Sequence, residues 1–127
     1  MEKRFVYADN AATTKISPAV KQAMIGALDL YGNPSSLYAL GDQAKTAIEK
    51  AREQCAKAIG CAPAEVFFTS GGTEADNWAI KGAAVRLRKK GKTHIISTAF
   101  EHHAVLHTLQ ALEKQGFSVT LLPVHEN

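Results

Sequence analysis

The chain contains 127 residues and carries a formal net charge of +3, because 15 lysines and arginines outnumber 12 acidic residues. Its content of 46% apolar and 21% charged residues is ordinary for a soluble globular protein the size of one small domain. The only dense basic run, residues 86–92 (RLRKKGK), follows an apolar-periodic stretch and contains a glycine, which is typical of a helix C-terminus. The composition therefore argues against binding to nucleic acid.

The cysteines and the apolar segments indicate a cytoplasmic protein. Cys55 and Cys61 are the only thiols, and two cysteines so close together do not make a disulfide framework. The charges in the opening MEKRFVYADNAATT are not followed by the apolar core of a secretion signal, and no stretch approaches the roughly 18 apolar residues of a membrane span. We expect a soluble, unexported protein with no membrane partner.

The first half of the chain predicts one short strand and two helices. Residues 4–8 have the composition of an extended segment. Residues 17–30 begin with serine and proline, the cap and first position of a helix. The glycine, asparagine and proline in residues 31–36 predict a turn, and the apolar residues in 37–60 then recur at helical spacing as far as a terminal glycine.

The second half alternates strands with helices. Residues 65–69 (EVFFT) predict a buried strand that enters a glycine turn, and Thr73 and Asp76 have the spacing of a capping box at the start of a helix that continues to Lys90. A strand at 93–98, a helix at 101–115 and a strand at 117–124 follow. This alternation predicts an α/β fold with a parallel sheet. With no helix after the last strand, we expect the fold to be incomplete in this chain.

The glycine turn is the first candidate site. In an open parallel sheet, ligands bind beyond the carboxyl ends of the strands. Ser70, Gly71, Gly72 and Thr73 would offer unpaired backbone N–H groups at the N-terminus of a helix, where a phosphate group binds well. The alternative is a plain strand-to-helix turn in which Thr73 serves only as the N-cap.

Two adjacent histidines follow the next predicted strand. His102 or His103 could stack on a flat ring or transfer a proton near neutral pH, whereas the alternative is a pair of solvated histidines at a helix start. His103 and His107 stand at i and i+4, but no acidic or thiol partner is near them in sequence. We therefore predict no metal site.

Four ordered motifs identify a family resemblance. They are YADNAATT at residues 7–14, YGNPSS at 31–36, FFTSGGTEADN at 67–77 and EHHAV at 101–105. In this order and at these separations they resemble the NifS- and IscS-like cysteine desulfurases, which are class V aminotransferase-like enzymes dependent on pyridoxal 5'-phosphate (PLP).

The resemblance implies a fold and an activity. The fold would be the amino-terminal part of the large domain of PLP-dependent transferase fold type I, a three-layer α/β/α arrangement with a mainly parallel sheet. Residues 1–15 would form an amino-terminal strand and loop, and residues 16–127 the first part of the PLP-binding domain. The activity would convert L-cysteine to L-alanine and leave a persulfide on the enzyme. A homodimer would then pass this sulfur to acceptor or iron–sulfur scaffold proteins, for iron–sulfur clusters or thiolation.

The resemblance also implies roles for single residues. Gly72 and Thr73 would hold the PLP phosphate, and His102 would stack on the pyridine ring and assist proton transfer, whereas His103 occupies a variable position. Four further residues match segments near the active site or the substrate, namely Asn10, Ala12, Thr13 and Asn33.

Other residues of the family's active site have no counterpart in this chain. The Schiff-base lysine, the aspartate that pairs with the pyridinium nitrogen and the persulfide cysteine would follow residue 127, so the chain alone is expected to be inactive. It could instead be a non-catalytic scaffold or assembly fragment. Another class V enzyme, such as a selenocysteine lyase or an aminotransferase, is a further alternative.

Overall fold

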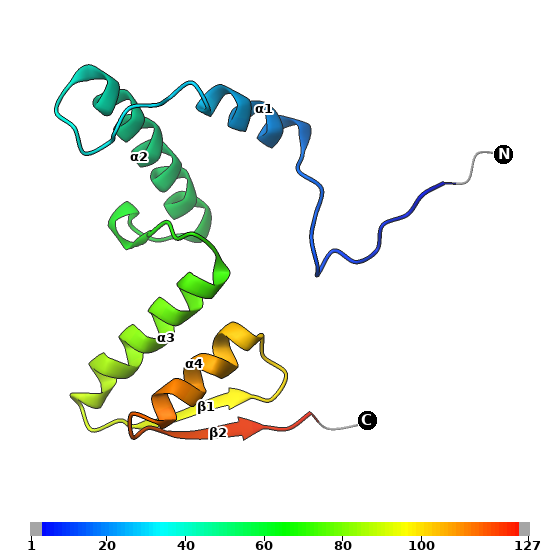
Figure 1. Cartoon of the computed structure of the whole chain (residues 1–127), viewed down its shortest axis with the longest axis vertical. Coiled ribbons are helices and arrows are strands. Elements are labelled where there is room, and N and C mark those ends of the chain that lie inside the picture. The colour runs from blue at the N-terminus through cyan, green and yellow to red at the C-terminus, as the bar shows by residue number, and fades with distance from the viewer. Residues whose placement is uncertain (1–3, 125–127) are drawn as a thin grey trace. The chain divides into compact units, whose positions relative to one another are not determined.

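A computed structural model describes residues 4–124 of the chain. The chain divides into two compact units, one that extends to Val66 and one that begins at Phe67. The predicted division after residue 15 stays a prediction. Each unit has its own elements and is described by itself (Figure 1).

The first unit is helical. Helix α1 spans Pro18–Ala27, and its N-cap Ser17 accepts a hydrogen bond from the Val20 amide at 3.2 Å. Helix α2 spans Ala39–Ile59 and ends at Gly60, whose φ of 74° is the left-handed conformation that glycine adopts without strain. A short 3₁₀ helix, η1, covers Pro63–Glu65. Both predicted helices of this half are thus confirmed.

The predicted turn at residues 31–36 packs closely against the start of α2. Gly32 faces the backbone of Leu40 so closely that a Cβ atom would overlap it, and Gly41 approaches the carbonyl of Asn33 in the same way. Glycine is required at both positions because of this close approach. The turn is therefore fixed to α2 by its backbone.

Two of the predicted strands are wrong. Residues 4–8 and 66–69 adopt no regular structure, and Phe67 and Phe68 are exposed instead of buried. A strand is stabilised by hydrogen bonds to a neighbouring strand, and within the part of the chain described here only the two strands of the second unit pair with each other. At the end of the first unit, the Val66 carbonyl accepts a hydrogen bond from the guanidinium of Arg52.

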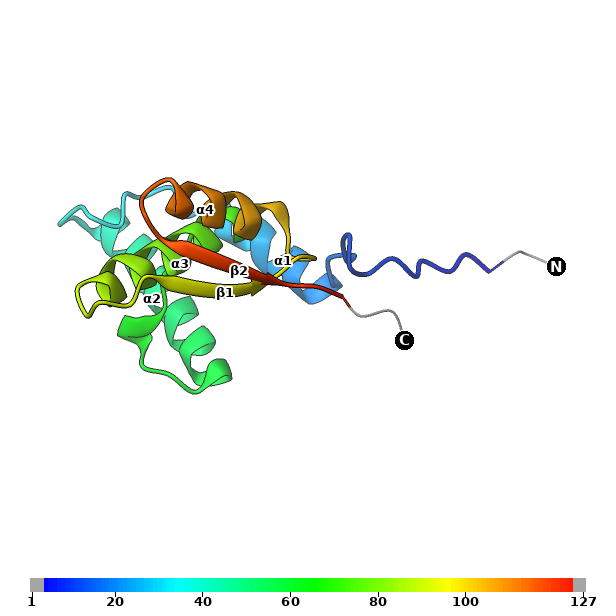
Figure 2. The same cartoon turned by 90° about the horizontal axis from the view of Figure 1, so that it is seen from below.

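The second unit contains a strand–helix–strand arrangement preceded by a helix. Helix α3 spans Gly72–Arg88, β1 spans His94–Thr98, α4 spans His103–Glu113 and β2 spans Ser118–Leu122. The strands are parallel, with Ile95 opposite Val119, and α4 forms the connection between them (Figures 1 and 2). The predicted α/β class and parallel pairing are confirmed, although the sheet has two strands here and three were predicted.

A small apolar cluster holds these elements together. Ala84 from α3, Leu112 from α4 and Phe117 before β2 form its buried centre, and Ile80 and Ile95 pack against it. Leu112 is the most enclosed large side chain, with 1% of its surface exposed. The cluster fixes α3 against α4, and this contact brings the N-terminal halves of the two helices together.

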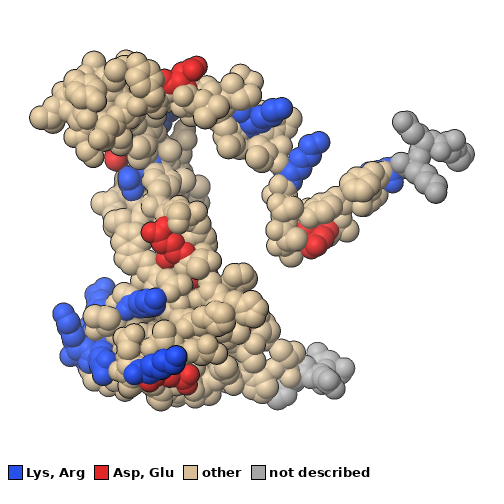
Figure 3. All heavy atoms as spheres, in the orientation of Figure 1, with Lys and Arg blue, Asp and Glu red and all other residues tan. Residues whose placement is uncertain are grey.

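The basic run lies where the sequence predicts, at the end of α3. Arg86 and Arg88 occupy the last turn of this helix, and Gly91 follows with a φ of 73°. The Arg88 guanidinium lies over the Phe117 ring, 5.1 Å from its centroid. Lys and Arg side chains gather on the surface of this unit (Figure 3). No helix in residues 4–124 is long and apolar enough to cross a membrane.

Candidate anion and ring site at the starts of two helices

Helix α3 begins without a side-chain cap. Its N-cap is Gly71, which has an extended backbone with φ 163° and ψ 178° and no side chain to accept a hydrogen bond. Within the described residues, the backbone N–H groups of Gly72, Thr73 and Glu74 have no hydrogen-bond partner, as is usual for the first turn of a helix. These three donors and the helix dipole favour an anion.

This geometry corrects one expectation. Thr73 lies inside the helix as its second residue, so the capping box of Thr73 with Asp76 is wrong. The alternative in which Thr73 is only the N-cap fails for the same reason. The glycine that precedes the helix takes the N-cap position because the chain arrives there in an extended conformation. The Thr73 hydroxyl is therefore not needed as a cap.

Glu74 and Ser70 form the outer part of this turn. Oε2 of Glu74 accepts hydrogen bonds from the Ser70 amide at 2.6 Å and from the Ser70 hydroxyl at 2.7 Å. The bond from the Ser70 backbone, and then that from its hydroxyl, lower the pKa of Glu74 below its ordinary value of 4.5. The side chain is thus a carboxylate at neutral pH.

Helix α4 begins at a histidine cap. His102 is its N-cap residue, and Nδ1 of the ring accepts a hydrogen bond from the Ala104 amide at 3.1 Å. Because Nδ1 acts as the acceptor, a neutral ring carries its proton on Nε2. The cap holds the ring in one orientation at the end of β1, with His103 as the first residue of the helix. The predicted helix therefore starts two positions after Glu101.

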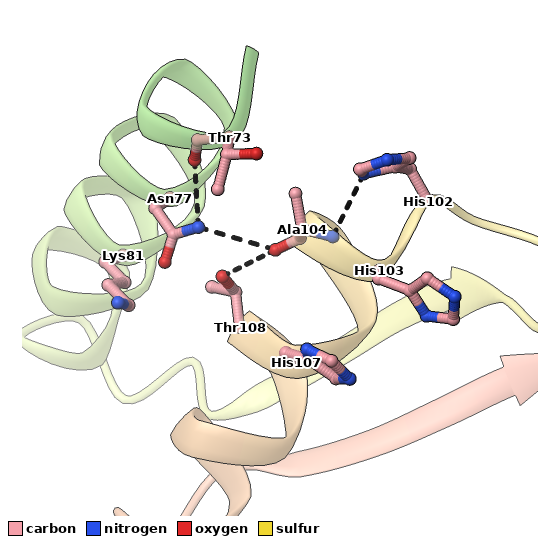
Figure 4. Close-up of a pocket in the computed structure, with 8 residues that line it drawn as sticks. All are labelled: Thr73, Asn77, Lys81, His102, His103, Ala104, His107 and Thr108. Carbon is pink, nitrogen blue, oxygen red and sulfur yellow. Dashed lines mark hydrogen bonds between the residues drawn. The ribbon is translucent and has the colours of Figure 1, made fainter. Parts of the chain in front are cut away.

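Asn77 connects the two helix starts, a role that the sequence alone did not indicate. Its Nδ2 donates to the Thr73 carbonyl at 2.9 Å and to the Ala104 carbonyl at 3.5 Å (Figure 4). The buried Thr108 hydroxyl also donates to the Ala104 carbonyl, at 2.8 Å. The spacing of four residues between Thr73 and Asn77 could have indicated the first of these bonds, but not the bond to Ala104.

The helix starts line an open pocket of about 310 Å³. Among the described residues, its lining contains one ammonium group and three imidazoles but no carboxylate, which suits an anionic or aromatic ligand better than a cation. The rings of His103 and His107 are stacked with centroids 5.5 Å apart. Residues 4–124 contain no group of three or more His, Cys, Asp or Glu that could hold a metal. The polar and charged lining comes mainly from Thr73, Asn77, Lys81, His102, His103 and His107.

The remaining predicted site residues belong to the first unit. The Ala12 amide donates to the Asp9 carbonyl at 3.3 Å, which closes a turn that includes Asn10. Asn33 accepts from the Ser35 amide at 2.9 Å through its side chain. Asn10, Ala12, Thr13 and Asn33 are all exposed, and their proximity to a substrate stays a prediction.

Comparison with known proteins defines the class of protein first. The model of the family described as aminotransferase class-V matches residues 6–127, nearly the whole chain. The chain therefore belongs to the aminotransferase class-V family. This agrees with an α/β unit in which a glycine turn and a histidine occupy the starts of neighbouring helices.

The individual relatives narrow the resemblance. A cysteine desulfurase IscS of Clostridium botulinum (strain Hall) is 55% identical over 122 residues, which cover 95% of this chain and 30% of the relative. A solved NifS-like protein superimposes with a TM-score of 0.83 at 44% identity, covering 91% of this chain and 32% of that structure. A structure described as SspA in complex with cysteine has a TM-score of 0.81 at 39% identity, with 91% and 33% covered.

These matches confirm two predictions. The chain resembles the cysteine desulfurases named above, and its fold is that of the corresponding part of the PLP-dependent transferases of fold type I. The chain spans about 30% of the length of the Clostridium botulinum relative. It therefore corresponds to one part of those proteins.

Proposed function

We propose that this chain provides the phosphate-binding turn and the ring-stacking histidine of a PLP-dependent cysteine desulfurase. The observation that carries the proposal is the start of α3, where three amides that have no partner among residues 4–124 follow an N-cap without a side chain. A phosphate dianion fits this donor set, because it can accept several N–H bonds and interacts favourably with the helix dipole. Gly72 and Thr73 would supply two of the amides, and the Thr73 side chain a hydroxyl.

PLP, when bound, serves as the electron sink for the chemistry of an amino-acid substrate. The role proposed for His102 is to pack its ring against the pyridine ring and to move a proton at Nε2. This role is supported by the Nδ1 cap bond, which fixes the ring and leaves Nε2 as the proton-bearing atom. A fixed ring requires less ordering when it contacts a cofactor.

L-cysteine is the proposed substrate. The names of the relatives and the cysteine bound in the SspA complex support it. We further propose a homodimer that resides in the cytoplasm and transfers sulfur to acceptor or iron–sulfur scaffold proteins. We propose that residues 6–127 contribute to cofactor binding but do not catalyse the reaction by themselves. None of their lysines has the neighbouring sequence of the family's Schiff-base lysine.

The proposal is tested by Thr73→Ala in the full-length protein. Loss of a hydrogen bond to a charged group costs about 1.5–3 kcal/mol, which corresponds to roughly tenfold to a hundredfold weaker PLP binding. The dissociation constant would be measured by absorbance titration of cofactor-free protein. Thr46→Ala, at an exposed position on α2, is the matched control and should leave PLP binding unchanged. Equal affinity of Thr73→Ala and the unmodified protein would refute the assignment.

A further inference from the structure

Glu74 contacts the turn in an unusual place. It is the third residue of α3, where a glutamate normally reaches back to the N-cap amide. Here the N-cap is Gly71, and the carboxylate instead binds both the amide and the hydroxyl of the preceding residue, Ser70. The Glu74 side chain thus reaches past Gly71 and restrains Ser70.

As a consequence, the backbone N–H groups of the first turn of α3 stay available to an anion. A side chain at the N-cap would accept a hydrogen bond from the second or third amide of the helix and so compete with an anion. Glu74 uses only donors of Ser70, so it leaves the amides of Gly72, Thr73 and Glu74 itself without a partner in the described part of the chain. The turn is ordered without occupying its anion-binding groups.

The two consecutive glycines make this turn flexible unless other residues restrain it. Gly71 and Gly72 have space around them: an added Cβ would meet no atom of the described residues within 4 Å, apart from its chain neighbours and the backbone of the helix itself. Consecutive glycines lose more backbone freedom on ordering than other residues. The other side-chain bond in this segment is that from the Thr69 hydroxyl to the Gly71 carbonyl, at 3.2 Å. The shorter Glu74 bonds are therefore the main side-chain restraint on the turn.

We propose that Glu74 is a positioning residue, which braces Ser70 so that the free amides at the start of α3 are preordered for a phosphate group. The brace is a property of the protein without ligand, whereas the identity of the phosphate as that of PLP rests on the proposed function. Glu74 does not contact the phosphate in this scheme. It acts through the backbone conformation of the turn.

The test compares Glu74→Ala with Glu74→Gln in the full-length protein. The glutamine retains an oxygen that can accept both Ser70 bonds, whereas alanine removes the acceptor. In cofactor-free protein, hydrogen exchange at the Ser70 amide should become severalfold faster in Glu74→Ala and change less in Glu74→Gln. PLP dissociation should accelerate in the same order. Ser70→Ala removes only the bond from the hydroxyl, so its exchange and PLP dissociation rates should lie between those of the unmodified protein and Glu74→Ala. This variant also keeps the proposal testable if Glu74→Ala fails to fold.

A matched control exists in the first unit. Oε2 of Glu65 accepts the Ala62 amide at 2.8 Å, which is the same kind of bond at another helix start. Glu65→Ala should change neither exchange at Ser70 nor PLP dissociation.

The two proposals fail in different ways. Unchanged Ser70 exchange in the Glu74 and Ser70 variants would overturn the brace, whatever PLP does. Faster exchange with unchanged PLP dissociation would overturn the positioning role, provided that Thr73→Ala weakens PLP binding. If exchange is faster but neither substitution affects PLP, the proposed function fails and the brace stands as a feature of the fold.

Discussion

Substitution of Gly71 by serine should increase helix stability while it weakens cofactor binding. The position has room for the side chain, because a Cβ there would meet no atom of residues 4–124 within 4 Å apart from its two chain neighbours. Its extended backbone, with φ 163° and ψ 178°, is accessible to any residue. Serine is a preferred N-cap whose hydroxyl oxygen accepts from the second or third amide of the helix, here Thr73 or Glu74.

The two effects have different magnitudes. Serine in place of glycine at an N-cap stabilises a helix by a few tenths of a kcal/mol. Occupation of one amide removes a hydrogen bond to the proposed phosphate, which costs about 1.5–3 kcal/mol, or roughly tenfold to a hundredfold in affinity. Thermal unfolding of the cofactor-free protein and absorbance titration with PLP would measure both quantities in the same sample.

Gly71→Ala is the control for the backbone effect alone, because it adds a Cβ without an acceptor oxygen. We expect Gly71→Ala to bind PLP more tightly than Gly71→Ser. If Gly71→Ser were more stable than the unmodified protein, as an occupied amide requires, and still bound PLP with equal affinity, the free amides would not be the anion-binding groups. The uncapped start of α3 would then have no part in cofactor binding.

Three further predictions concern His102, Glu74 and Leu112. His102→Asn retains an N-cap acceptor but has no imidazole ring, so this variant should lose the absorbance signature of bound PLP and keep its stability. His102→Phe retains a ring but has no acceptor, so its free energy of unfolding should fall by about 1 kcal/mol. The reverse pattern would contradict the two roles. The lowered pKa of Glu74 stabilises the folded state above the ordinary value of 4.5, and this contribution is lost as the pH falls through the lowered value. Unfolding measured between neutral and acidic pH should therefore show a smaller loss in Glu74→Gln, and an identical profile would exclude the linkage. Leu112→Ala, at a site with 1% exposure, should cost about 2–5 kcal/mol in denaturant unfolding, and a cost below about 1 kcal/mol would mean that the cluster is not the core of the unit.

Local chemistry explains most of what the sequence predicted. Ser17 with Pro18 and the left-handed Gly60 mark helix ends whose signals lie within a few residues, so both were found. The parallel pairing of β1 with β2 followed from the alternation of strands and helices. The two helices of the site and the pair of parallel strands could therefore be predicted from the chain alone.

The wrong predictions have two causes. Some depend on partners that are distant in sequence, and others concern positions where more than one residue could form the same local structure. Residues 66–69 have the apolar composition of a strand, but composition does not supply the neighbouring strand that would pair with them. At the start of α3, Thr73 and Gly71 both had suitable positions for an N-cap, and the extended conformation of the glycine decided between them. The bridge from Asn77 to Ala104 joins positions 27 residues apart, and no local pattern indicates it.

The hydrogen bonds of Asn77 bear on how the site would recognise a ligand. The side-chain amide of Asn77 donates to the carbonyls of Thr73 and Ala104. It thereby links the turn that would bind the anionic group of a ligand to the helix whose start would contact the ligand's ring. The distance between the two helix starts is thereby restrained in the protein without ligand. If the proposed function is right, a molecule that carries both an anion and a ring should bind more tightly than one that carries only one of the two.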